Sequence, residues 1–66
     1  MDIILNGQQE TLDGAMTIHD LLVKKRLLPE TVVVEVNLEI IDRERFCETV
    51  IQDRDVVEIL RFVGGG

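Results

Sequence analysis

The chain has 66 residues, a length that suits one small domain and leaves little room for a catalytic cavity. Thirteen Asp and Glu residues against seven Lys and Arg give a net charge of −6, which argues against nucleic acid and anionic membranes as partners. One cysteine excludes an internal disulfide or a cluster of thiolate ligands and favours the reducing cytoplasm. We also expect no signal peptide, no membrane span and no metal site. Because the core is too small for a catalytic cavity, an enzyme acting alone is disfavoured.

The first predicted elements form a β-hairpin. Residues 2–5 are a short apolar run, and residues 8–12 are expected to be the returning strand. Asn6 and Gly7 lie between them, and this dipeptide favours a two-residue type I′ turn because both residues tolerate positive φ. The pair Asp13-Gly14 then ends the second strand.

A helix is predicted over residues 18–26. Thr17 and Asp20 have the capping-box spacing, in which a hydroxyl and a carboxylate satisfy free N–H groups of the first turn. Pro29 prevents the helix from continuing. The apolar residues of the helix recur on one face: Ile18, Leu21 and Leu22.

Strands dominate the second half of the chain. Residues 32–36 are mostly β-branched and favour a buried strand. Residues 37–39 can turn, residues 40–41 begin a short extended piece, and the polar segment 42–49 favours one helical turn. The longest predicted strand covers residues 56–63, and either of its two faces could belong to the core.

This order of elements favours an α+β fold in which one helix lies across a mixed sheet. That arrangement is the β-grasp, the fold of ubiquitin. We expect a β-grasp domain over residues 1–63 and a flexible glycine tail over residues 64–66.

The glycine tail is the most informative feature of the sequence. Gly64, Gly65 and Gly66 carry no side chains, so an extended tail can thread a narrow channel and present the α-carboxylate of Gly66 to another protein. A carboxylate is a poor electrophile and needs activation before it reacts. The chain has no phosphate-binding loop, so a partner must supply this chemistry. A frayed end or a cloning scar is the competing explanation.

Several segments along nearly the whole chain carry a resemblance to a known family: Asn6-Gly7, Thr17-Ile18, Leu21-Leu22, Val34–Asn37, Ile40-Ile41 with Arg43, Gln52–Ile59 and Phe62–Gly66. In these segments the sequence resembles the ThiS family, the sulfur carrier proteins of thiamin biosynthesis. Two residues depart from the family pattern: Asp42 stands where proline is frequent, and Arg54 where glycine is frequent. Both lie in predicted turns, so they place the local turn geometry in question.

The resemblance implies a defined cycle. An E1-like adenylating enzyme of the ThiF family would convert the Gly66 carboxylate to an acyl-adenylate with ATP and magnesium, which the partner rather than this chain would bind. Sulfur from a persulfide donor would then give a C-terminal thiocarboxylate. Thiazole synthase, of the ThiG family, would transfer that sulfur into the thiazole ring. The chain would be a carrier with no catalytic residues of its own.

Two alternatives remain open at this point. The small subunit of molybdopterin synthase, or a related sulfur-donor protein, has a similar fold and tail. A β-grasp protein-interaction module with an inert tail belongs to a different functional class.

Other residues have both structural and functional interpretations. Phe62, Leu60 and Glu58 are the predicted docking residues for a partner, although Phe62 has equal claim to a place in the core. Cys47 lacks a second cysteine nearby and is expected to be half-buried beside Phe46 rather than reactive. Three carboxylates near the start of the last strand resemble a site for a hard cation: Asp53, Asp55 and Glu58. A solvated turn is the better interpretation of this cluster.

Overall fold

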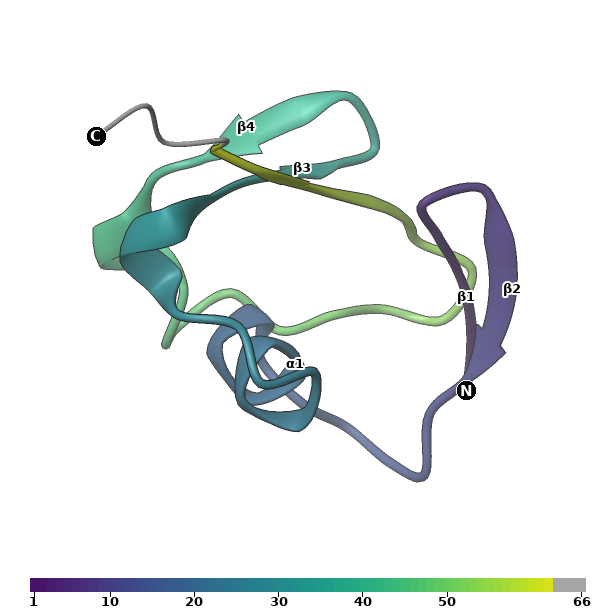
Figure 1. The fold of residues 1–66 in the computed structure, drawn as a ribbon. Helices are drawn as coiled ribbons and strands as arrows, with labels where there is room; N and C mark the ends of the chain where they lie inside the picture. Colours follow the sequence, from purple (N-terminus) through teal and green to yellow (C-terminus); the bar gives the residue numbers. More distant parts are fainter. Residues whose placement is uncertain (63–66) are drawn as a thin grey trace.

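The computed structural model describes residues 1–62, which fold into a five-stranded sheet crossed by one helix (Figure 1). The elements are β1 (Asp2–Leu5), β2 (Gln8–Thr11), α1 (Ile18–Lys24), β3 (Val32–Val36), β4 (Glu39–Ile41) and β5 (Val56–Arg61), with short 3₁₀ turns at Pro29–Thr31 and Arg43–Arg45. Val63, predicted to end the last strand, and the tail at 64–66 lie outside the described residues.

The strand order is β2-β1-β5-β3-β4, so the last strand occupies the centre of the sheet between two hairpins. β1 and β5 run parallel, and every other neighbouring pair is antiparallel. Helix α1 packs against one face of this mixed sheet (Figure 1). The fold is a β-grasp, which confirms the predicted α+β class.

Both hairpins close through two-residue turns with positive φ. Asn6 and Gly7 have φ of 50° and 82°, as the Asn-Gly pair predicts. In the second hairpin Asn37 and Leu38 have φ of 53° and 71°, and Glu39, expected in the turn, is instead the first residue of β4. A leucine in this left-handed region is uncommon because its Cβ crowds the backbone.

The predicted capping box is present at the start of α1. The backbone N–H of Asp20 donates to Thr17 Oγ1 at 3.1 Å, and the N–H of Thr17 donates to Asp20 Oδ2 at 3.1 Å. The apolar face of the helix is completely buried, as its spacing predicts: Ile18, Leu21 and Leu22 are each 0% exposed.

The helix ends at Lys24, two residues before the predicted end. Arg26 adopts a φ of 60°, and the N–H of Leu27 donates to the carbonyl oxygen of Leu22 at 2.9 Å. These are the features of a Schellman motif, which usually places glycine at the left-handed position. An arginine holds that position here, so the usual sequence signal for the helix end was missing.

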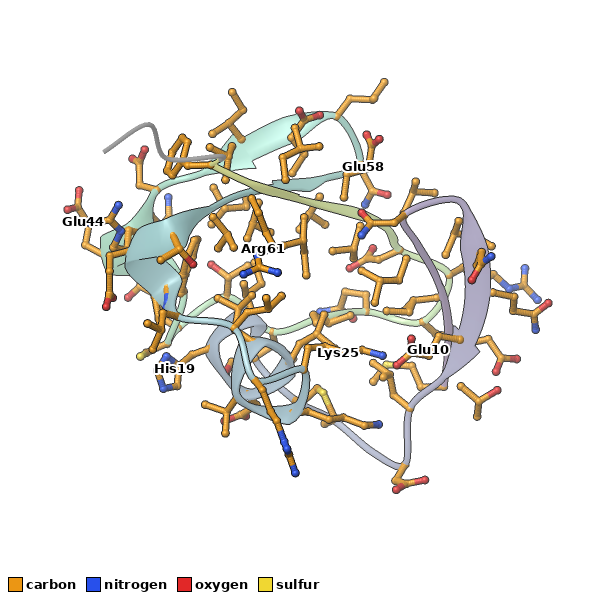
Figure 2. All side chains as sticks on the ribbon, in the orientation of Figure 1. Glu10, His19, Lys25, Glu44, Glu58 and Arg61 are labelled. Carbon is orange, nitrogen blue, oxygen red and sulfur yellow. The ribbon has the colours of Figure 1, made fainter. Side chains whose placement is uncertain are left out.

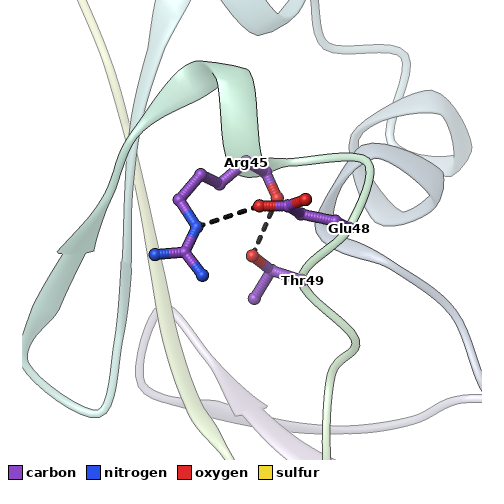
Figure 3. Close-up of polar contacts among 3 residues, drawn as sticks. All are labelled: Arg45, Glu48 and Thr49. Carbon is purple, nitrogen blue, oxygen red and sulfur yellow. Dashed lines mark hydrogen bonds and ion pairs between the residues drawn. The ribbon is translucent and has the colours of Figure 1, made fainter.

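The segment between β4 and β5 is irregular and is hydrogen-bonded to α1. The predicted helical turn is the 3₁₀ turn Arg43–Arg45, after which Phe46 is buried in the core. Arg45 Nε donates to Glu48 Oε1 at 3.1 Å, and Thr49 Oγ1 donates to the carbonyl oxygen of Arg45 at 2.7 Å (Figure 3). Cys47 is exposed, so the expected half-buried position is wrong; Phe46 alone turns inward.

The two departures from the resembled family keep the expected turn geometry. Asp42 has a φ of −64°, which is the value that proline imposes, and it follows an extended residue of β4. Arg54 has a φ of 71°, in the region that glycine enters most easily. The backbone therefore retains conformations suited to proline and glycine while other residues occupy both positions.

Candidate functional site

The last strand, β5, leads toward the glycine tail and presents two different faces. Val57 and Ile59 point toward α1 and are buried. Leu60 and Phe62 lie on the opposite face and are 54% and 56% exposed. Glu58, two residues before Leu60 on the same face, is half-buried. The open question about Phe62 is therefore answered by the structure, which places this residue outside the core.

Hydrogen bonds hold β5 from both sides up to its end. Asn6 Oδ1 accepts a hydrogen bond from the N–H of Ile59 at 2.8 Å, beyond the last residue of β1. On the other side, the N–H of Phe62 donates to the carbonyl oxygen of Thr31 at 2.9 Å. The chain is thus held by the sheet up to Phe62. The predicted roles of Gly64, Gly65 and Gly66 concern residues outside those described.

The side of the sheet turned away from α1 is polar toward its β2 edge, where Asp2, Gln9 and Thr11 lie, and largely apolar over β5, β3 and β4. We call this apolar part, together with Ile4 of β1, the outer sheet face. Its members follow from strand register and alternation: Ile4, Val33, Glu35, Ile40, Val56, Glu58, Leu60 and Phe62. Figure 2 shows Glu58 on this side and Arg61 on the helix side. All three predicted docking residues share the outer sheet face.

Glu35 is a residue of this face that sequence reasoning did not single out. It lies directly opposite Glu58 in the antiparallel pair of β3 and β5. Alternation along 32–36 places Glu35 and Val34 on different faces, but only the register of two distant strands brings the two carboxylates together.

The three residues that resembled a cation site do not form one. Asp55 is 8% exposed, and its carboxylate accepts hydrogen bonds from Asn37 Nδ2 at 2.9 Å and from the N–H of Gln52 at 2.8 Å. Asp53 instead accepts from the N–H of Asp2 at 2.8 Å. Residues 1–62 contain no cluster of metal-ligating side chains. Asp55 lies in the predicted turn, where its N–H donates to the carbonyl oxygen of Gln52 at 3.1 Å, but its carboxylate is a buried structural acceptor, so the predicted solvation is wrong at this residue.

A cavity of about 330 Å³ lies between the first hairpin, the end of α1 and β5. Its lining includes an ion pair between Lys25 Nζ and Glu10 Oε1 at 2.7 Å, and Arg61 from β5 (Figure 2). The two charges of the ion pair neutralise each other.

Cys47 is a free thiol at the surface. Within residues 1–62, the structure contains no helix with the length and apolar character needed to cross a bilayer.

Comparison with known proteins gives consistent matches in sequence. The model of the ThiS family matches residues 3–66. The sulfur carrier protein ThiS of Bacillus subtilis is 54% identical over 50 residues, which cover 76% of this chain and 76% of that protein. The thiazole synthase of Paramagnetospirillum magneticum is 33% identical over 66 residues, which cover all of this chain and 20% of that protein.

The fold has a solved counterpart. The crystal structure of the thiamine biosynthesis protein ThiS from Geobacter metallireducens superposes with a TM-score of 0.86 at 39% sequence identity, covering the whole of both chains. Because the family model spans nearly the entire sequence and the fold agrees, this chain belongs to the ThiS family.

Proposed function

We propose that this protein is a sulfur carrier of thiamine biosynthesis and that the α-carboxylate of Gly66 is the group that carries sulfur. The observation that supports this most directly is the family match over residues 3–66, because it includes the three glycines. The B. subtilis relative is named a sulfur carrier protein, which favours this role over a molybdopterin pathway or an inert tail.

The proposed chemistry takes place on the Gly66 carboxylate in a partner's active site. A carboxylate oxygen attacks the α-phosphorus of ATP, and pyrophosphate leaves with the help of magnesium. The resulting acyl-adenylate has a good leaving group, so sulfur from a persulfide donor attacks the carbonyl carbon and AMP departs. This attack leaves an acyl disulfide. A second thiolate then attacks the donor's sulfur in that disulfide, so the sulfur–sulfur bond breaks, a thiocarboxylate remains on Gly66, and the thiol and the donor sulfur end as a disulfide. ATP and magnesium are substrates of the partner, a ThiF-family adenylating enzyme.

Thiazole synthase is the proposed acceptor of the sulfur. In two proteins of that name, a segment similar to all of this chain makes up 20% of the polypeptide. Joining two proteins in one polypeptide raises their effective concentration, an advantage when they act in succession. This arrangement supports a ThiG-family partner for the chain described here.

The outer sheet face is the proposed docking surface for the adenylating enzyme. Leu60 and Phe62 are exposed apolar residues on the strand that leads to the tail, and Glu58 adds charge beside them. Exposed apolar side chains next to a reacting segment favour a protein interface, because docking removes them from water as it positions the tail.

Intact-mass analysis tests the proposed function. We expect the chain, incubated with a ThiF-family enzyme, ATP, magnesium, a persulfide donor and a thiol reductant, to gain the mass difference between sulfur and oxygen. Fragmentation should place that gain on Gly66. Because Cys47 is an exposed thiol that persulfides can modify, Cys47→Ser is the matched control and should gain the same mass. A gain found on Cys47, and lost in this control, would contradict the proposal.

A further inference from the structure

Two carboxylates face each other at the centre of the outer sheet face. Glu35 on β3 and Glu58 on β5 are direct cross-strand partners. The hydrogen bonds that flank them, from Phe62 to Thr31 and from Asn37 to Val56, place them in a hydrogen-bonded pair, for which the Cα atoms are about 5.5 Å apart. Their side chains therefore rise side by side from the sheet.

This arrangement costs the domain stability. Like charges directly opposite each other in neighbouring strands repel, and both glutamates are half-buried, so water screens them only partly. Among residues 1–62, no ion pair involves either carboxylate. The fold itself gains nothing from the pair, which indicates that the compensating charge lies elsewhere.

Apolar residues lie on most sides of the two glutamates. Leu60 and Val33 form the cross-strand pair on one side. On the other side Val56 lies between Ile4 of β1 and Asn37, whose N–H donates to the carbonyl oxygen of Val56. Ile40, which is 68% exposed, lies beside Glu35 on β4. Charge at the centre of an apolar surface is the reverse of the usual polar rim and requires an exact counter-charge when the surface is covered.

A second copy of this chain is a poor occupant for this surface. Face-to-face association would bring four carboxylates together between two molecules that each carry a net charge of −6. A partner with a cationic side chain amid apolar residues fits both features. A guanidinium suits the site better than an ammonium, because its fork of five N–H donors can bridge two carboxylates on adjacent strands.

We propose that the outer sheet face binds an apolar surface of the adenylating enzyme that inserts one arginine between Glu35 and Glu58. This inference rests on the proposed function, since it assigns the docking chemistry of that partner. The two glutamates then favour binding of the partner over self-association. Their mutual repulsion, which destabilises the free chain, is relieved when the guanidinium binds.

Glu35→Gln and Glu58→Gln test the inference through two measurements that should move in opposite directions. Removing one charge relieves the repulsion, so each variant should show a higher midpoint of urea unfolding. The same change leaves the partner's arginine half-paired, so each Kd for the ThiF-family enzyme should rise about tenfold or more, with a weaker dependence on salt. Asp13→Asn, which removes the same charge from an exposed loop, should bind like the parent chain.

The outcomes separate this inference from the docking proposal. If both glutamine variants bind like the parent while Phe62→Ala binds weakly, the arginine is wrong and the docking surface stands. If Phe62→Ala also binds like the parent, the outer sheet face is not the docking surface and both proposals fail. If the double glutamine variant binds the enzyme normally but sediments as a dimer, the pair acts only against self-association, and the inference is overturned.

Discussion

Asn6 Oδ1 accepts a hydrogen bond from the backbone N–H of Ile59 at 2.8 Å, across 53 positions of sequence. β1 ends at Leu5, so this side-chain oxygen takes the place of a further residue of β1 in the parallel pair with β5. Asn6 also holds a φ of 50° in the hairpin turn. One residue thus both closes the first hairpin and aligns the strand that leads to the tail.

We expect Asn6→Gly to lower the free energy of unfolding by about 1–2 kcal/mol, because glycine keeps the turn but leaves the partly buried N–H of Ile59 without its acceptor. Asn6→Asp is the matched control, since it retains both an oxygen at this position and a tolerance for positive φ. Urea unfolding followed by circular dichroism measures both. Equal stability of the glycine variant and the parent chain would show that the hydrogen bond contributes nothing.

Asp55 is the second polar residue on which the fold depends. Its buried carboxylate accepts from Asn37 Nδ2 and from the N–H of Gln52, while Asn37 Oδ1 accepts from the N–H of Val56 at 2.9 Å. Asp55→Ala leaves two donors unpaired, and we expect a loss of about 2–4 kcal/mol in unfolding free energy. The exposed Asp53→Ala is the control and should lose clearly less, so similar losses from the two variants would argue against a buried network.

The sequence alone predicts the elements whose signals are local. The Asn6-Gly7 turn and the capping box at Thr17 each depend on neighbouring residues, and both are present in the structure. The end of α1 was predicted two residues too late because Arg26, rather than glycine, holds the left-handed position.

The features that escaped prediction depend on contacts between distant segments. Asp55 is buried because Asn37, 18 residues earlier, meets it across the end of the sheet. Glu35 belongs to the candidate site because the strand register places it opposite Glu58. Alternation predicts which residues of a strand share a face, but it does not predict which strand is the neighbour or which residues pair.

Arg54 offers a direct test of the turn before β5. Its φ of 71° is unfavourable for a residue with a side chain, and its own side chain is almost fully exposed. We expect Arg54→Gly to raise the unfolding free energy by about 0.5–1 kcal/mol, the relief of left-handed strain less the extra entropy of glycine in the unfolded chain. Lys24→Gly, at the last residue of α1, should instead lower it by up to about 1 kcal/mol. A loss of stability in Arg54→Gly would mean that the arginine side chain makes a contribution of its own.

Phe62→Ala tests the docking surface separately from the fold. The side chain is 56% exposed, so its removal should leave the unfolding midpoint nearly unchanged. Binding to a ThiF-family enzyme should weaken by about 1 kcal/mol or more, measured by calorimetry, because exposed apolar anchors contribute at this level when an interface buries them. Val23→Ala removes a side chain of similar exposure, 61%, from the helix side and is expected to bind normally. Equal affinities of the two variants would remove Phe62 from the docking surface.

The glycine tail provides the sharpest test of the carrier mechanism, because binding and chemistry should separate there. Deleting Gly66, or adding one alanine after it, moves the carboxylate by one residue, roughly 3.5 Å along an extended chain. Near-attack geometry tolerates about 1 Å, so we expect sulfur loading to be lost. Gly65→Ala should impair loading nearly as much, since a β-carbon would obstruct a narrow channel.

The outer sheet face is unchanged in these tail variants, so their affinity for the adenylating enzyme should stay within a few-fold of the parent value. Mass spectrometry measures the loading, calorimetry the affinity and thermal melting the fold. If the variant with the added alanine still gained sulfur, the terminal carboxylate of Gly66 would not be the reacting group.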